Sequence, residues 1–172
     1  MKQEPEMPAT ALAHADSTPS DPLPDFDLNQ YLPFLINRGA TRVAADFGSG
    51  LKPHGVNITV WRLLASLNQH SSQRIGELSD FTGIEMWTVS RVVSRLEQDG
   101  MVERHRGDED ARGVIVSLTP AGRTLVETLI PEAQRYESVI LEGFSKEEAN
   151  CLRALLDRLF ENMRGRSGAP CR

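Results

Sequence analysis

The stretch from Ser72 to Arg123 reads SQRIGELSDFTGIEMWTVSRVVSRLEQDGMVERHRGDEDARGVIVSLTPAGR, and it decides the fold. A helix is expected over residues 85–99, because four apolar residues recur there at i, i+3, i+4 and i+7, the spacing of one buried face. These residues are Val89, Val92, Val93 and Leu96. The other faces of this helix carry short hydrogen-bond donors and long cations: Thr88, Ser90, Arg91, Ser94 and Arg95.

The segments on either side of this helix complete a recognisable unit. A shorter helix precedes it, with Ile75, Leu78 and Phe81 as its expected inward positions. Gly100 suits a helix C-cap that needs a positive φ. Two strand-like segments follow, over 101–106 and 114–118, joined by the charged tip GDEDARG. The pattern predicts a mainly α protein of the winged helix-turn-helix class, with a three-helix core and a small β-hairpin wing, and this class reads duplex DNA.

Length and charge set the frame for this interpretation. The chain has 172 residues and a formal net charge of −5, which suits one domain with one core. Residues 1–29 hold one lysine and six acids, so 18 cations balance 18 acids over residues 30–172. A field that attracts DNA must therefore come from local clustering of cations, and not from the global charge.

The two ends of the chain are expected to lie outside the folded domain. Residues 1–28 are rich in Pro, Ala, Ser, Thr and acids, which predicts a disordered tail, and 165–172 are expected to form a flexible C-terminal tail. The N-terminal segment lacks the apolar core of a signal peptide, and no run of 18 apolar residues suggests a membrane span. Two cysteines, Cys151 and Cys171, form no secreted disulfide framework, so we expect a cytoplasmic protein.

Further helices are expected around the central unit. The first covers about 29–47 and is followed by a loop rich in Gly and Pro over 48–55. Asn57 or Thr59 can cap the next helix, and Thr119 followed by Pro120 starts a long helix in which Pro131 is expected to produce a kink. The last helix opens with a capping box, Ser145 to Glu148.

The terminal helices carry more apolar surface than a small winged helix can cover. We therefore expect the segments 29–56 and 119–164 to form a dimerisation domain, with the winged unit over 57–118 between them. A two-fold dimer also matches palindromic half-sites one DNA turn apart. The alternative is a monomer that folds these helices onto its own core.

Residues 30–164 resemble the MarR family of bacterial transcription regulators. The resemblance rests on TVSRVVSRLEQDGMVER (88–104), on DEDAR (108–112) and on VSLTPAGR (116–123). It implies that Asp110 and Arg112 form the pair that holds the hairpin tip. It further implies a homodimeric, usually repressing regulator that a small ligand releases from its palindromic operator. An aromatic carboxylate or an aromatic acyl-CoA thioester is the ligand class expected.

Several residues of the central unit are candidates for DNA contact. Arg91 is the best candidate to read a base, because a guanidinium matches guanine O6 and N7. Arg112 suits insertion into a narrow minor groove, with Asp110 orienting it. The full set of expected contacts is Thr88, Ser90, Arg91, Ser94, Arg95, Arg104, Arg106, Asp110 and Arg112.

Three of these assignments have a structural alternative. Arg95 can form an ion pair with Asp99 at i+4 instead of contacting phosphate. Arg104 and Arg106 can lie on a solvated strand face. Trp87, which stands beside the expected contacts, is expected to pack against the hairpin or the preceding helix, with contact to a thymine methyl group as its alternative.

The ligand site is assigned by the resemblance alone, since relatives hold effectors between the dimer helices and the winged unit. Asn37, Arg38, Arg42 and Trp61 fall near that crevice, and a cation beside an aromatic ring suits an aromatic carboxylate or thioester. The alternative is structural: Arg42 pairs with Asp46, and Trp61 is a core residue. The histidines lack metal-ligand spacing, and no metal or cofactor is expected.

Two other classes of function are alternatives to the regulator. An enzyme is disfavoured, because the chain has no nucleophile elbow, P-loop, H-E-x-x-H motif or paired-cysteine metal motif. A dimeric winged helix that docks protein instead of DNA, without a ligand response, is the alternative that the neutral charge keeps open.

Overall fold

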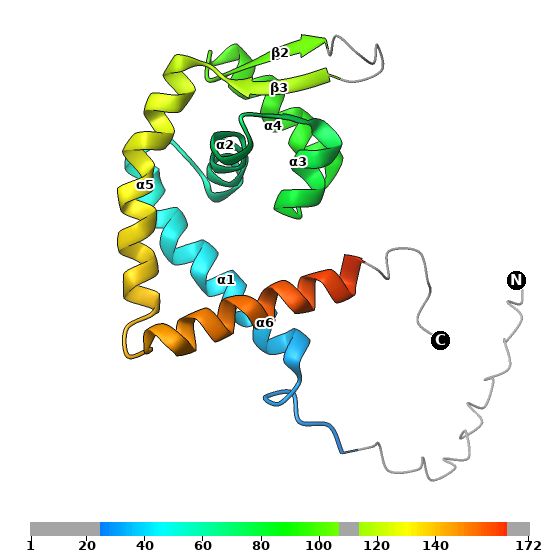
Figure 1. Ribbon diagram of the computed structural model, residues 1–172, viewed down its shortest axis with the longest axis vertical. Helices are drawn as coiled ribbons and strands as arrows, with labels where there is room; N and C mark the ends of the chain where they lie inside the picture. The colour runs from blue at the N-terminus through cyan, green and yellow to red at the C-terminus, as the bar shows by residue number, and fades with distance from the viewer. Residues whose placement is uncertain (1–24, 107–113, 165–172) are drawn as a thin grey trace, which may run out of the picture. The chain divides into compact units, whose positions relative to one another are not determined.

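The computed structural model describes residues 25–106 and 114–164 and is shown in Figure 1. The helices are α1 (Leu32–Leu51), α2 (Ile58–His70), α3 (Ile75–Thr82), α4 (Met86–Gln98), α5 (Pro120–Ile140) and α6 (Lys146–Arg164), with a short 3-10 helix, η1 (Lys52–His54), after α1. The strands are β1 (Ser72–Arg74), β2 (Val102–Arg106) and β3 (Val114–Leu118). No helix within these described ranges is long and apolar enough to span a bilayer. The predicted class, mainly α with a winged helix-turn-helix, is confirmed.

The chain divides into two units within α1, at Gly39. In the first unit, the described residues form a turn and the start of α1, where Phe26 and Tyr31 make an edge-to-face aromatic contact with ring centroids 5.2 Å apart. The second unit, residues 40–172, contains the rest of α1 and all the other elements. The winged unit lies wholly in the second unit.

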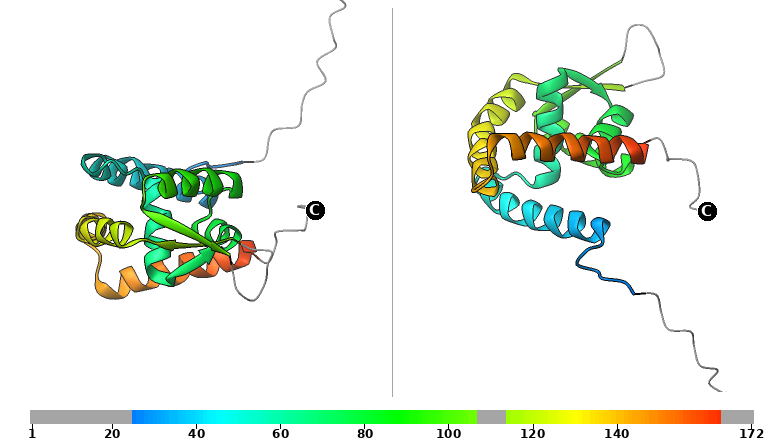
Figure 2. Two further views of the ribbon diagram at one scale, coloured as in Figure 1. Left: turned by 90° about the horizontal axis from the view of Figure 1, so that it is seen from above. Right: turned by 60° about the horizontal axis from the view of Figure 1, so that its bottom comes forward.

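The sheet has three strands, where the sequence predicted only a hairpin. β3 pairs with β2 on one side and with β1 on the other, both antiparallel, in the order β1-β3-β2. β1 has only three residues and no run of apolar side chains, so no periodicity marked it in advance. Figure 1 shows β2 and β3 side by side at the top of the view, above α4, and Figure 2 gives two further views of these strands.

One core holds α2, α3, α4, the sheet and the start of α5 together. Leu63, Leu64 and Leu67 of α2 are buried beside Leu78 of α3. The same core holds Val89, Val93, Leu96, Val102, Val116, Leu118 and Val126. The predicted buried face of α4 is therefore confirmed, with Val92 half-buried at its margin. Burial of these side chains stabilises α4 by fixing its inner face, and it leaves the outer face free.

Three predicted details of the helices are confirmed. The Asn57 side chain accepts a hydrogen bond from the Val60 amide (2.9 Å), which caps α2. The Ser145 Oγ accepts from the Glu148 amide, and the Glu148 carboxylate accepts from the Ser145 amide, which is a complete capping box. Gly100 has a φ of 71°, as the end of α4 requires.

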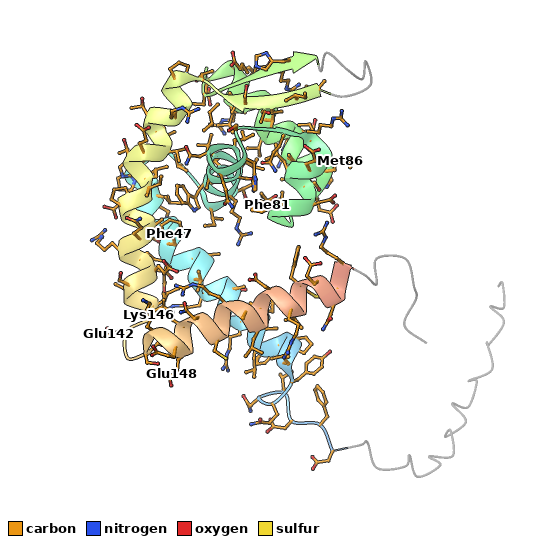
Figure 3. The ribbon with its side chains drawn as sticks, in the orientation of Figure 1. Phe47, Phe81, Met86, Glu142, Lys146 and Glu148 are labelled. Carbon is orange, nitrogen blue, oxygen red and sulfur yellow. The ribbon has the colours of Figure 1, made fainter. Side chains whose placement is uncertain are left out.

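Two details are wrong. The segment 48–50 was predicted as loop, but α1 continues through it to Leu51, because the fully buried Leu51 packs with Phe47, Val56 and Leu129. Phe81 was predicted to point inward, but 51% of it is exposed (Figure 3). A side chain three residues further along an α-helix lies about 60° around the axis from the first. Phe81 therefore lies to one side of the face that buries Leu78.

The start of α5 is fastened to the start of β2. Thr119 caps α5 by accepting a hydrogen bond from the Gly122 amide (3.1 Å), and its hydroxyl donates to the Gly100 carbonyl (2.7 Å).

Further along, the Tyr136 hydroxyl of α5 donates to the Val43 carbonyl of α1 (3.3 Å), and burial raises the pKa of this phenol. The helix runs unbroken from Pro120 to Ile140 with Pro131 inside it.

Candidate nucleic-acid interface

The outer face of α4 is polar, cationic and open to solvent. Ser90, Arg91 and Arg95 are exposed on it, and Thr88 and Ser94 are half-buried at its edges. The buried residues Val89, Val93 and Leu96 occupy the opposite side of the helix. The five residues of α4 predicted to contact DNA therefore lie together on the side of the helix that the core leaves uncovered.

Trp87 lies in the middle of this outer face, and the prediction that it packs against the hairpin or α3 is wrong. The structure leaves 62% of Trp87 exposed. Its ring meets the guanidinium of Arg91, whose Cζ lies 5.0 Å from the ring centroid. This distance is typical of a cation–π contact, so Trp87 orders the side chain of the best candidate base reader.

Arg104 of β2 braces the hairpin against α4. Its Nη2 donates to the Ser94 Oγ (2.7 Å) and to the Ser90 carbonyl (3.4 Å). Its Nε lies 3.3 Å from Glu97 Oε2, an ion pair without the alignment of a hydrogen bond. Only 28% of the Arg104 side chain is exposed. The structure thus places Arg104 as a residue that positions α4, with little of its guanidinium available to DNA.

Ser94 is engaged by the same brace. Its hydroxyl accepts from Arg104 and donates to the Ser90 carbonyl one turn earlier (2.9 Å). Both partners belong to the protein, so a contact between Ser94 and DNA competes with this local network. Ser90 keeps its own hydroxyl exposed beside Arg91.

Arg95 and Asp99 form the ion pair that was the alternative to phosphate contact. Their closest atoms are 3.8 Å apart, and 82% of the Arg95 side chain is exposed. An exposed pair of this length contributes little stability, so Arg95 can exchange Asp99 for a phosphate at small cost.

The hairpin carries the other predicted contacts. In β2, Arg106 pairs through its backbone with Val114, while its side chain and the whole of Asp110 and Arg112 lie outside the described residues. His105 contacts Ser117 of β3 (2.9 Å) and lies 3.2 Å from Glu103.

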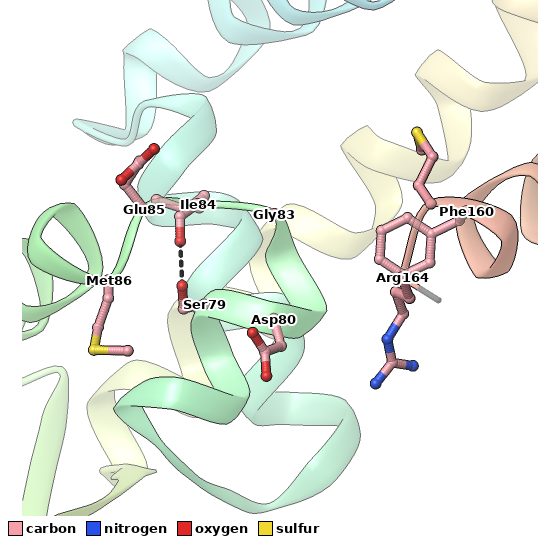
Figure 4. A pocket seen from close by; sticks show the side chains of 9 residues that line it. Ser79, Asp80, Gly83, Ile84, Glu85, Met86, Phe160 and Arg164 are labelled. Carbon is pink, nitrogen blue, oxygen red and sulfur yellow. Dashed lines mark hydrogen bonds between the residues drawn. The ribbon is translucent and has the colours of Figure 1, made fainter. Parts of the chain in front are cut away.

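The turn between α3 and α4 is fixed by local hydrogen bonds. The Ser79 hydroxyl donates to the Ile84 carbonyl (2.7 Å), a bond drawn in Figure 4. At the start of α3, the Arg74 amide donates to the Glu77 carboxylate (2.7 Å). The Ser79–Ile84 bond ties the end of α3 to the segment that leads into α4, and the Glu77 bond caps the start of α3.

The residues predicted to bind a small ligand belong to both units, and each is described within its own unit. Asn37 and Arg38 belong to the first unit, where the Arg38 guanidinium lies 5.5 Å from the Phe34 ring centroid. In the second unit, Arg42 pairs with Asp46 at 2.8 Å, which was its structural alternative. Trp61 is half-buried and meets Phe47 edge to face (5.8 Å), so it packs between the two buried clusters.

Trp61 nevertheless lines a hollow of about 320 Å³ together with Arg62, Gln69 and Phe81. A larger hollow of about 660 Å³ lies elsewhere, between the α3–α4 turn and the last turn of α6. Figure 4 shows Phe160 and Arg164 on its α6 side. The hollow beside Trp61 has the better chemistry for an aromatic acid, because it joins two aromatic rings and one guanidinium. Neither Arg62 nor Phe81 was predicted from the sequence as a ligand residue.

Comparison with known proteins identifies the family. A sequence model of the MarR family matches residues 56–114. The transcriptional repressor IacR of Pseudomonas putida is 24% identical over 83% of this chain and 86% of its own length. A crystal structure of a MarR-family transcriptional regulator from Silicibacter pomeroyi superposes with a TM-score of 0.71 and 31% identity, over 79% of this chain and 92% of that one.

A third similar protein is BpsR of Bordetella bronchiseptica, whose structure concerns the regulation of DNA binding by 6-hydroxynicotinic acid. It superposes with a TM-score of 0.67 and 25% identity, over 74% of this chain and 96% of that one. The chain described here belongs to the MarR family of DNA-binding transcriptional regulators, a family with ligand-responsive members.

Proposed function

We propose that this protein is a homodimeric transcriptional repressor that binds a palindromic operator and leaves it when a small aromatic acid binds. The observation that carries the proposal is the outer face of α4, where Ser90, Arg91 and Arg95 stand exposed on a helix whose inner face is fixed in the core. A rigid helix with donors and cations on its free side has the chemistry that the major groove requires.

The roles on DNA follow from exposure and charge. Arg91 reads a base, Thr88 and Ser90 contact base edges or phosphates, and Arg95 holds a phosphate in place of Asp99. Arg104 positions α4 through its hydrogen bond to Ser94. On the hairpin, Arg106 contacts the DNA, and Arg112 enters the minor groove with Asp110 orienting it.

The dimer is proposed from the apolar surface that the flanking helices leave open. On α6, the exposed apolar residues are Leu152, Leu155, Leu156, Phe160 and Met163, and at the end of α5 they are Val139 and Ile140. Surface of this kind, continuous along one helix, marks a site where a second chain packs. We assign residues 57–118 to DNA binding, and 29–56 and 119–164 to the contact between two copies.

The effector class is proposed from the hollow beside Trp61. The rings of Trp61 and Phe81 suit an aromatic body, and the Arg62 guanidinium suits a carboxylate. BpsR, whose DNA binding is regulated by 6-hydroxynicotinic acid, and the repressor IacR support an aromatic acid and repression. An aromatic acyl-CoA thioester is the second member of this class. Such a ligand ejects DNA only if it binds more tightly to the state that cannot bind DNA.

The test is binding of the full chain to the promoter fragment beside its own gene, repeated with aromatic acids, 6-hydroxynicotinic acid and CoA thioesters. We expect tight binding that falls with salt and that one of these compounds abolishes. Arg62→Gln should lose the response to that compound and keep DNA binding. Binding that no compound disturbs would contradict the proposed effector class, and an Arg62→Gln protein with a normal response would contradict the site.

A winged-helix dimer that docks protein is the second candidate, and the balanced charge of residues 30–172 favours it. It differs from the first in one measurable property. A DNA reader releases counterions from phosphates, so its affinity falls steeply as salt rises. If the chain shows no DNA affinity at low salt while it is dimeric, the docking function replaces the repressor.

A further inference from the structure

Trp87 presents a large apolar ring to solvent at the first turn of α4. It is 62% exposed, in a helix whose other large apolar side chains, apart from the neighbouring Met86, are buried or half-buried. An exposed tryptophan gives up burial that would stabilise the fold by roughly 2–3 kcal/mol. The fold therefore gains little from the ring at this position, and a binding role accounts for it better than packing does.

The ring and the Arg91 guanidinium form one unit. The two residues are four apart, which places them on the same side of the helix. The guanidinium Cζ lies 5.0 Å from the ring centroid. When a planar guanidinium lies with its face on an aromatic ring, the N–H groups at the edge of the guanidinium point away from the ring. The two donors that match guanine O6 and N7 therefore stay available.

Position on the helix directs this unit toward the bases. The N-terminal residues of a recognition helix are those that contact base edges in the major groove. Trp87 is the second residue of α4, and Arg91 lies one turn further on. Both stand opposite Val89, Val93 and Leu96, on the side that the core leaves free. The aromatic face and the cation therefore reach the groove together.

We propose that Trp87 and Arg91 together read a thymine next to a guanine, with the indole packed on the thymine methyl group and the guanidinium bound to the guanine. Thymine is the only ordinary base that offers a methyl group in the major groove, and an indole face is an apolar surface without an acceptor. This inference rests on the proposed DNA-binding function, and it adds which base step the operator must contain in each half-site.

The experiment first selects binding duplexes for the full chain from a random library. Each thymine of the selected half-site is then replaced by deoxyuracil, which removes the methyl group and keeps every hydrogen-bonding atom. Affinity is measured for the wild type, Trp87→Ala and Trp87→Phe. Met86→Ala is the matched control, because Met86 is also exposed at the start of α4 but is not part of the Trp87–Arg91 contact.

For the wild type, we expect one thymine beside a guanine at which the methyl group matters. Loss of one methyl contact weakens binding about fourfold, so replacement in both half-sites weakens it about fifteenfold. Trp87→Ala should bind the thymine and the uracil duplexes equally, Trp87→Phe should keep part of the preference, and Met86→Ala should keep all of it. Circular dichroism and thermal unfolding confirm that each variant is folded.

Three results overturn the inference, and they distinguish its failure from the failure of the proposed function. If duplexes are selected but no thymine-to-uracil change matters, or if Trp87→Ala keeps the wild-type preference, the inference is wrong and the DNA-binding function stands. If no duplex is selected from the library by the folded, dimeric protein, both are wrong.

Discussion

At the scale of single residues, Gly122 and Arg104 hold the winged unit together. Gly122 lies where the first turn of α5 passes the Met101 carbonyl, and a Cβ atom there would collide with that backbone oxygen. Arg104 crosses from β2 to α4 and contacts Ser90, Ser94 and Glu97. The sequence marked Gly122 only as part of a motif and Arg104 only as a cation on a strand. Neither role could be predicted, because each depends on a contact between segments that are distant in sequence.

Gly122→Ala should lower the free energy of unfolding by about 3 kcal/mol, because backbone cannot move aside as a flexible side chain does. Chemical denaturation measures the change. Gly76→Ala is the control: Gly76 also lies in the first turn of a helix, but a Cβ there meets nothing within 4 Å. That variant should be neutral or more stable by up to about 1 kcal/mol. Equal effects of the two substitutions would show that the close approach at Gly122 does not exist.

Arg104→Gln should lower the free energy of unfolding by about 1–2 kcal/mol, because a partly buried charged hydrogen bond is lost. It should also weaken binding to all DNA sequences alike, since α4 loses its brace. Arg95→Gln serves as the comparison, because its guanidinium is exposed and its pair with Asp99 is long. It should leave stability within about 0.5 kcal/mol of the wild type. An Arg104→Gln protein of unchanged stability would contradict the bracing role.

At the scale of elements, periodicity predicted those helices that bury one regular face. The sequence predicted the buried side of α4 and the caps at Asn57 and Ser145, because each depends only on residues within two helical turns. β1 could not be predicted, because three residues are too few to show a periodicity. The end of α1 could not be predicted either, because the burial of Leu51 extends the helix through the glycines before it. For the candidate site, the sequence predicted which face of α4 is free but not the exposure of Trp87.

The capping box of α6 gives a pH dependence. The backbone hydrogen bond from Ser145, with the Ser145 side chain second, lowers the pKa of Glu148 below its ordinary value. A carboxylate with a lowered pKa in the folded state stabilises the fold above its unfolded pKa, and this contribution is lost as the pH falls through the folded value. Glu148→Ala should therefore reduce thermal stability at neutral pH and much less in acid.

Thermal unfolding across pH for the wild type and Glu148→Ala provides the measurement. Glu147→Ala is the matched control, because Glu147 stands in the same first turn and the Ser145 amide donates to Glu148 instead. If the gap between wild type and Glu148→Ala stays constant from neutral to acidic pH, ionisation of Glu148 is not what stabilises the start of α6.

At the scale of the whole molecule, a single chain leaves apolar side chains of α6 and of the end of α5 exposed to solvent. Leu152, Leu155 and Leu156 are each exposed on the same helix. A two-fold dimer would cover such a surface in both copies at once, and it would place two α4 helices for two half-sites. Residues 30–172 carry as many cations as acids, so the proposed operator specificity depends on a few contacts by α4 and the hairpin and not on a general basic field.

Leu156→Glu should convert the proposed dimer to a monomer, because it would place a charge in the proposed apolar contact between copies. Light scattering coupled to size-exclusion chromatography measures the mass, and DNA affinity should fall by more than tenfold since one half-site is lost. Asp157→Ala, at the next position of α6, should remain dimeric and bind normally. A wild-type protein that is monomeric at micromolar concentration would contradict the proposed assembly.

The central claim is that the outer face of α4 reads DNA sequence, and the most direct test compares wild type with Arg91→Ala on a selected operator and on a scrambled duplex. Fluorescence anisotropy across a range of salt gives both affinities. We predict that Arg91→Ala loses about 1–3 kcal/mol on the operator and much less on the scrambled duplex, with the protein equally stable. If Arg91→Ala binds both duplexes as the wild type does, α4 is not the element that reads the operator.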